Sequence, residues 1–303
     1  MKRNIYSYSK LWIIFFVLMG AACTNQVEDA IPVSGQPIEF SVQSDWKEIP
    51  NTRSNDGKTK FEKGNQIQIF GFHTSSSGAE KKFMYRVGEP ARGQIVTFDS
   101  INWNYSPKRF WPKEGTLDFY ASYPEFSVLN DEENHKMTYE QTVNPLQLDL
   151  LWGIATNRDC AEACKKPVQI WMVHALAKVN IKFDDSLGKI KEAKVSAYKA
   201  GYFSGTNDGI PIWEYESDSI QTATIYPYEN QQTIGDATVF IFPKGITGLI
   251  LTKLDGTVID VSYKIQNITF DAGKEYNLTI SKGVQKKNTN SRSIAMSVRC
   301  VSE

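Results

Sequence analysis

Apolar and polar residues alternate one by one in many short stretches of this sequence. Near the N-terminus, Ile38, Phe40 and Val42 alternate with polar residues. Similar stretches cover residues 67–72, 117–121, 169–183, 193–198, 237–242, 248–254 and 276–280. Because successive side chains of a strand point to opposite faces, this alternation predicts β-strands. No long stretch has the 3.6-residue period of an amphipathic helix, so the sequence predicts an all-β fold.

The length of the strand-rich part suits two domains. One β-sandwich takes about 100 residues, and turn signals such as Asp255-Gly256 separate the predicted strands. We therefore expect two tandem β-sandwich domains, over residues 37–164 and 165–303. The polar segment 156–166 sets this boundary, and an alternative places it one strand later, near residues 184–188.

The N-terminus has the pattern of an export signal. Positive charges at Lys2, Arg3 and Lys10 accompany a short apolar run over residues 11–19, which is too short to span a bilayer of roughly 30 Å as a stable helix. Small residues at positions 20–22 come directly before Cys23 and resemble a bacterial lipobox, in which the cysteine is acylated. We expect a signal peptide over residues 1–22 and a lipidated tether over residues 23–36. The alternative is an ordinary signal peptide followed by an incidental cysteine.

The charge balance bears on the kind of partner. Lys plus Arg and Asp plus Glu both number 34, so the formal net charge is zero. A nucleic-acid-binding protein needs a basic excess to displace counterions from phosphates, so we expect no nucleic-acid partner. Loss of residues 1–22 would remove three basic residues from the 34 and leave the mature chain slightly acidic.

The residues that usually carry catalysis are few and scattered. Hydrolase, nucleotide-binding and zinc-protease motifs are absent from the sequence, and His73, His135 and His174 lie far apart. Cys160 and Cys164 are close enough in sequence to form a local disulfide or to remain free thiols, and a lone C-x-x-x-C is weak evidence for zinc. We expect no enzyme activity, no catalytic residue, no cofactor and no metal.

Seven segments, taken together and in order, resemble the fimbrillin-like family of exported lipoproteins, which includes the subunits of type V pili. They cover residues 49–55, 60–72, 101–124, 149–156, 168–183, 240–256 and 270–280. The resemblance implies two β-sandwiches of transthyretin-like, Greek-key topology in a fimbrial subunit. It also implies an outer-membrane precursor that is cut by an arginine-specific protease near its N-terminus. The first strand is then lost, and the groove accepts a strand from a neighbouring subunit.

Two segments fit this scheme. Arg53 lies in a polar stretch after the strand of Ile38, Phe40 and Val42, so cleavage there would strip these three side chains from a core. Arg53 is alternatively an ordinary surface arginine. The candidate donor strand is residues 292–301, with Ile294, Met296, Val298 and Cys300 on one face; alternatively it is the last strand of its own domain.

The expected partners are therefore other fimbrial subunits, through strand exchange, and outer-membrane lipid, through Cys23. The alternative function is an uncleaved surface lipoprotein that binds a host glycan or protein as an adhesin. Three D-S-[IL] triplets, at residues 99–101, 185–187 and 218–220, resemble the O-glycosylation signal of proteins exported by the same bacteria.

Overall fold

The computed structural model describes residues 31–44, 61–125, 128–131, 135–140, 149–205, 211–215, 219–227, 231–282 and 296–302. Nearly all regular structure in these residues is β-strand, which confirms the predicted all-β class. The helices described are short: α2 (Cys160–Ala163), the 3-10 helix η2 (Asp185–Leu187) and α3 (Ser262–Ile265). None of the described helices is long and apolar enough to cross a membrane.

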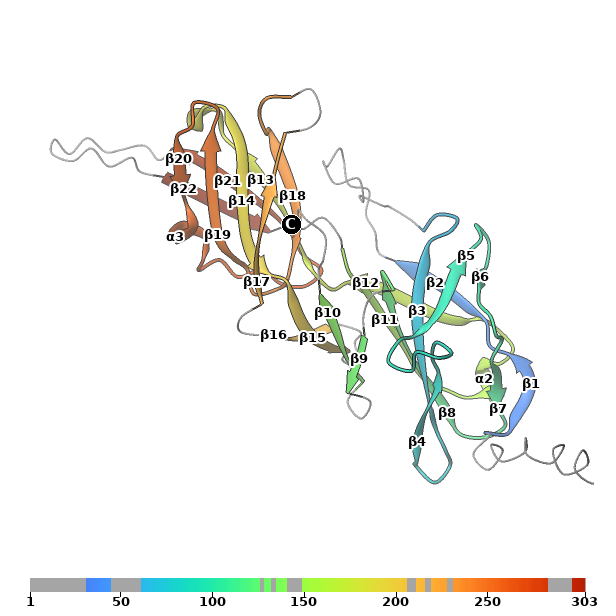
Figure 1. Ribbon diagram of the computed structural model, residues 1–303. Helices are drawn as coiled ribbons and strands as arrows, with labels where there is room; N and C mark the ends of the chain where they lie inside the picture. Colours follow the sequence, from blue (N-terminus) through green and yellow to red (C-terminus); the bar gives the residue numbers. More distant parts are fainter. Residues whose placement is uncertain are drawn as a thin grey trace, which may run out of the picture.

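One lobe, at the right of Figure 1, is built around an eight-stranded sheet. Its strands are β2 (Phe40–Ser44), β3 (Gln66–Thr74), β4 (Glu80–Met84), β5 (Gln94–Phe98), β6 (Trp103–Asn104), β8 (Thr116–Tyr123), β11 (Leu151–Arg158) and β12 (Val168–His174). Their order is β4-β3-β5-β6-β2-β12-β11-β8, and β3 also pairs with β8. The pairings therefore close a ring, with β4 attached outside it. A separate two-stranded sheet joins β1 (Val33–Pro37) to β7 (Phe110–Pro112).

The inside of this ring is a single apolar core. Alternate residues of its strands are buried there, as the period-two pattern requires. The cluster includes Ile38, Phe40, Val42, Ile67, Ile69, Val96, Trp103, Tyr105, Trp111, Leu117, Phe119, Leu151, Ile170 and Met172. We call this the ring core.

The other lobe consists of two four-stranded sheets that share a second core. One sheet has the order β18-β13-β21-β22, with β13 (Ala177–Phe183), β18 (Asp236–Ile241), β21 (Glu275–Lys282) and β22 (Met296–Ser302). The other has the order β17-β14-β19-β20, with β14 (Ile190–Tyr198), β17 (Ile220–Ile225), β19 (Ile246–Lys253) and β20 (Val258–Asp260).

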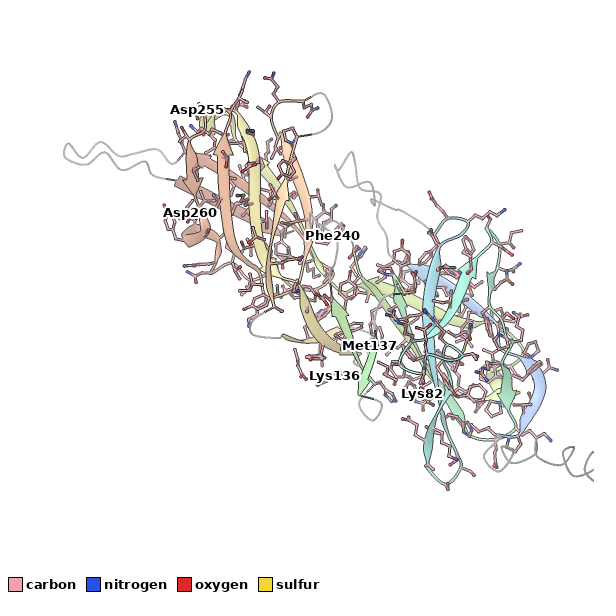
Figure 2. The ribbon with its side chains drawn as sticks, in the orientation of Figure 1. Lys82, Lys136, Met137, Phe240, Asp255 and Asp260 are labelled. Carbon is pink, nitrogen blue, oxygen red and sulfur yellow. The ribbon has the colours of Figure 1, made fainter. Side chains whose placement is uncertain are left out.

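A third sheet and a third core lie between the lobes (Figure 1). The sheet combines β9 (Val128–Asp131) and β10 (Lys136–Glu140) with β15 (Ala200–Gly205) and β16 (Pro211–Tyr215). The core, which we call the junction core, draws on the eight-stranded sheet through Phe70 and Trp152 and on the far lobe through Phe240. Figure 2 shows Met137 and Phe240, both buried in it.

The apolar stretch 169–183, expected as one strand, forms two strands in different sheets. β12 ends at His174 and β13 begins at Ala177, and Ala175 and Leu176 between them are buried in the junction core. β12 pairs with β11 and β2, so the expected boundary at residues 164/165 falls between strands of one sheet. The chain leaves the eight-stranded sheet after β12. Both linker residues are apolar, so the period-two pattern gives no sign of the break.

Candidate functional site at the N-terminal strand

β2 closes the ring of the eight-stranded sheet. On one side it pairs in parallel with β12 over five residue pairs, from Phe40 opposite Val168 to Ser44 opposite Met172. On the other side, Phe40 opposite Trp103 is its single pair with β6. β2 is the only described strand that links β6 to β12.

The three apolar residues of the predicted N-terminal strand all enter the ring core. Ile38 just precedes β2, while Phe40 and Val42 belong to it, and all three are buried. The ring of Phe40 packs edge-on against Phe119, with centroids 5.3 Å apart. Burial of each such side chain contributes about 1.5–3 kcal/mol. The three side chains therefore supply a large part of the free energy that keeps this segment packed in the ring.

Hydrogen bonds fix the backbone just before β2. The amide of Ile38 donates to the carbonyl of Arg109 at 2.9 Å, and the amide of Val168 donates to the carbonyl of Glu39 at 2.7 Å. The hydroxyl of Tyr105 donates to the carbonyl of Ile38 at 2.8 Å. Burial raises the pKa of Tyr105 to about 12, so this hydroxyl stays a donor at neutral pH.

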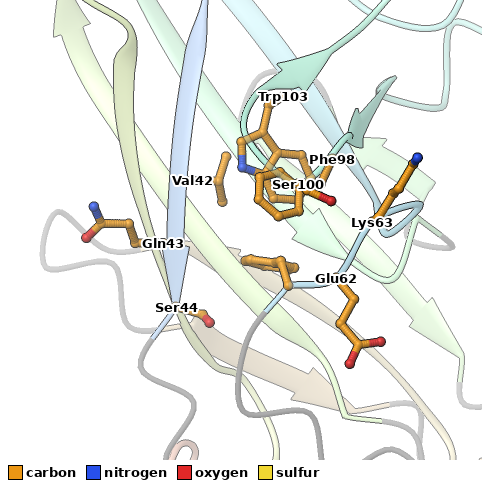
Figure 3. A pocket seen from close by; sticks show the side chains of 9 residues that line it. Val42, Gln43, Ser44, Glu62, Lys63, Phe98, Ser100 and Trp103 are labelled. Atoms are coloured by element: carbon orange, nitrogen blue, oxygen red, sulfur yellow. The ribbon is translucent and has the colours of Figure 1, made fainter.

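A pocket of about 550 Å³ opens beside the end of β2. In Figure 3, Val42 faces Trp103 while Gln43 points to the opposite side of the strand. Phe98 and Phe61 pack on Trp103, with ring centroids 5.1 and 4.9 Å away. The pocket therefore adjoins the ring core through Val42, Phe61, Phe98 and Trp103, and polar residues complete its lining: Gln43, Ser44, Glu62, Lys63 and Ser100.

At the other end of the chain, β22 is the edge strand of its sheet. It pairs antiparallel with β21, with Val298 opposite Ile280 and Cys300 opposite Leu278. Ile280 and Leu278 of β21 are buried residues of the second core.

Several predicted site residues fall outside the described residues: the lipidation residue Cys23, the processing residue Arg53 and Ile294 of the predicted donor strand. Met296, Val298 and Cys300 lie in β22, whose backbone is described. The structure brings Ile38, Phe40 and Val42 together in one core.

The cysteines and histidines of the described residues form no cluster suited to a metal ion. Cys160 and Cys164 are free thiols, and no group of three or more His, Cys, Asp or Glu residues suited to a metal occurs in this part of the chain. His174 hydrogen-bonds with Asp149 beside the junction core, and Nε2 of buried His73 lies 2.9 Å from the carbonyl oxygen of Glu114.

His135 contacts the eight-stranded sheet from the turn before β10. Its ring stacks on Tyr120 and hydrogen-bonds with that hydroxyl at 2.9 Å and with Glu80 at 3.0 Å. Sequence reasoning missed this contact, because residues 80, 120 and 135 share no short-range motif.

The three triplet serines differ in access. Ser100 and Ser186 are exposed. Ser219 is buried, and its hydroxyl donates to the carbonyl of Ala200 at 3.0 Å. A glycosyl group could therefore reach only the first two in the folded chain.

The sequence of this chain matches the family model described as fimbrillin-like over residues 52–295. The chain belongs to the fimbrillin-like family. Comparison with curated proteins finds no match.

Solved structures share the fold of this family member. A candidate cell adhesion protein from Bacteroides uniformis ATCC 8492 has a TM-score of 0.55 and 17% identity, over 89% of this chain and 98% of that one. Another candidate adhesion protein, from Bacteroides ovatus ATCC 8483, has a TM-score of 0.52 and 14% identity, over 88% of this chain and 95% of that one. At these identities the similarity shows a common fold.

Proposed function

We propose that the protein is a structural subunit of a fimbrium that assembles by strand exchange and supports adhesion. In this proposal the chain is exported as a lipoprotein, acylated at Cys23 and held at the outer membrane by lipid. Cleavage after Arg53 then frees the segment that contains β1 and β2, and a strand from another subunit replaces β2 in the ring.

The observation that carries the proposal is the position of β2. Removal of β2 would open the ring between β6 and β12, because no other described strand joins them. It would also uncover the places of Ile38, Phe40 and Val42 in the ring core. Unpaired backbone and exposed core together favour the addition of a new strand.

β22 supplies the donor in this proposal. It is an edge strand, so it can leave one side of β21 without breaking a second pairing in its sheet. Its apolar positions 296, 298 and 300 repeat the spacing of Ile38, Phe40 and Val42. The lobes around the ring core and the second core then correspond to the two tandem sandwich domains of a fimbrillin, with the boundary after β12.

The test treats the purified protein with an arginine-specific protease and compares it with the variant Arg53→Lys. We expect a stable product that begins at Ser54 and forms ladders on denaturing gels when samples are not heated. The variant should keep its N-terminus and stay monomeric. Cleavage at Arg53 without any oligomer, or ladders formed equally by Arg53→Lys, would contradict the proposal.

An uncleaved surface adhesin is the second candidate function, and Trp171 favours it. This side chain is 56% exposed on β12, between Gln43 of β2 and Ile154 of β11. An exposed indole face beside an amide side chain suits contact with a sugar ring. A glycan-array signal that is lost in Trp171→Ala and retained in Arg53→Lys would support this function.

A further inference from the structure

The C-terminal segment of the chain repeats the sequence pattern of the N-terminal strand. Residues 38–44, which end with β2, read IEFSVQS, and residues 294–300, which end within β22, read IAMSVRC. Aligned in the same direction, the two segments have the same residue at the first, fourth and fifth positions. The third position holds a large apolar residue in both segments, and the seventh holds Ser in one and Cys in the other.

The burial of residues 38–44 explains which positions match. The first, third and fifth of these residues are buried in the ring core, and the C-terminal segment has Ile, Met and Val there. Among the first six positions, chemical character changes only where Glu39 aligns with Ala295 and where Gln43 aligns with Arg299. Glu39 and Gln43 are exposed. Because alternate residues of a strand share a face, residues 294–300 keep the buried face of residues 38–44 and vary the open face.

The seventh position lies at the pocket beside the end of β2. Ser44 borders this pocket, whose lining includes the aromatic side chains of Phe61, Phe98 and Trp103. Cysteine behaves as a small apolar residue when it is buried. Cys300 therefore suits a place beside this aromatic lining better than the serine with which it aligns.

The sixth position brings a new contact on the outer face of the sheet. Gln43 is opposite Trp171 in the pairing of β2 with β12, and Trp171 is 56% exposed. In Figure 3, Gln43 points to the side of the strand away from Val42 and Trp103. An arginine at this place can lay its guanidinium on the exposed indole, which is a cation–π contact that glutamine cannot make.

The same match indicates which chain accepts the strand. Loss of β2 would leave a groove shaped by the side chains that residues 38–44 fill. The strand that fits this groove best has the same apolar residues at the same spacing, and residues 294–300 of this chain have them. A second copy of the chain is therefore the acceptor that suits its C-terminal strand.

We propose that the protein polymerises with copies of itself, and that residues 294–300 of one subunit take the places of residues 38–44 in the next, in the same direction and register. Arg299 of the donor then packs on Trp171 of the acceptor. Cys300 of the donor lies opposite Met172 of the acceptor, as Ser44 does in the uncut chain. This inference rests on the proposed strand exchange and specifies its partner, direction and register.

Disulfide mapping in the full-length chain tests the register. All chains carry Cys160→Ser/Cys164→Ser, and cleavage at Arg53 removes Cys23, so Cys300 is the remaining native thiol. Facing residues of neighbouring strands have Cα atoms about 4.8 Å apart, which a disulfide can bridge. After cleavage and assembly, oxidised glutathione joins facing thiols, and samples are heated in SDS without reductant.

Two acceptor positions distinguish the two directions of the donor. In the proposed register, Met172→Cys places a thiol opposite Cys300, so its ladders should survive heating. A donor of reversed direction would bring Cys300 to the place of Ile38, opposite residue 166, so ladders of Lys166→Cys should be lost on heating. Addition of Cys300→Ser to Met172→Cys is the control and should also abolish the heat-stable ladders.

The outer-face contact gives a second test that leaves the buried residues of the groove unchanged. Arg299→Gln restores the residue that β2 has at this position, and its unheated ladders should dissociate about two- to fivefold faster in SDS. Trp171→Ala should have a similar effect, and the double variant should dissociate no faster than the faster single variant. Tyr226→Ala, at a residue 65% exposed on the other lobe, should change nothing. This test decides the register if Met172→Cys does not fold.

Unheated ladders separate this inference from the strand exchange on which it rests. Their absence after cleavage at Arg53 would contradict strand exchange itself. Ladders that form but are made heat-stable by Lys166→Cys rather than Met172→Cys would contradict only the direction and register. Additive effects of Arg299→Gln and Trp171→Ala would contradict the proposed contact, and ladders that form only after another fimbrial subunit is added would contradict self-assembly.

Discussion

The hydroxyl of Tyr105 donates a hydrogen bond to the backbone carbonyl of Ile38 at 2.8 Å. Tyr105 belongs to the part of the ring that stays in the proposed assembly, and Ile38 belongs to the segment that leaves. This contact therefore joins the two parts of the molecule that cleavage would separate.

Replacement of Tyr105 by Phe should loosen the N-terminal segment. The change keeps the ring in the core but leaves the buried Ile38 carbonyl without this donor, which costs about 1–2 kcal/mol. We expect a lower urea midpoint and faster release of the cut segment. Tyr226→Phe is the control, because Tyr226 is 65% exposed, and it should leave both quantities unchanged.

Tyr105 also makes the stability of the folded protein decrease as the pH becomes alkaline. Burial raises the pKa of Tyr105 to about 12, from an ordinary value of 10.0, so the folded state holds this proton more tightly than the unfolded state. The stabilisation is complete below pH 10 and is lost as the pH rises toward 12, at about 1.4 kcal/mol per pH unit. Burial also raises the pKa of Tyr120 and Tyr139, which adds slope of the same sign.

Urea unfolding at pH 9, 10 and 11 measures this effect. In Tyr105→Phe, the free energy of unfolding should fall less steeply with pH, because the contribution of Tyr105 is lost. The contributions of the other ionisable groups remain. Identical slopes in the two proteins would show that Tyr105 does not titrate as its burial requires.

Position 115 requires glycine for two reasons: its backbone has a positive φ, and neighbouring atoms leave no room for a Cβ. Gly115 and Gly78 both have positive φ, at +78° and +84°, so Ala costs about 1–2 kcal/mol at either site. At Gly115 an added Cβ would also overlap the Thr74 carbonyl and lie 2.6 Å from Nε2 of His73, whereas Gly78 has open space. We expect Gly115→Ala to lower the free energy of unfolding by roughly 2 kcal/mol more than Gly78→Ala. Equal losses in urea unfolding would contradict the contact argument.

The sequence was sufficient to place the residues of individual strands on a buried or an open face. The alternation of Ile38, Phe40 and Val42 predicted a buried face, and all three residues are buried. When one face of a strand lies in the core, residues i and i+2 share that face. The alternation of apolar and polar residues is therefore visible within the strand's own sequence.

The sequence could not show which strands pair. The partner of β2 is β12, more than a hundred residues away, and their parallel register has no short-range signal. The closure of the ring by β3 and β8 is likewise a long-range pairing.

The central claim is that β22 of one subunit takes the place of β2 in another, and mixing two variants measures this directly. The acceptor is cut at Arg53 and lacks residues 292–303; the donor carries Arg53→Lys and keeps its C-terminal strand. The account predicts a one-to-one complex that resists unheated denaturing gels, no complex from either protein alone, and a weaker complex when the donor also carries Val298→Asp. The acceptor must first be shown to be folded. The absence of a complex would then contradict strand exchange, and so would a complex that forms equally with a donor lacking residues 292–303.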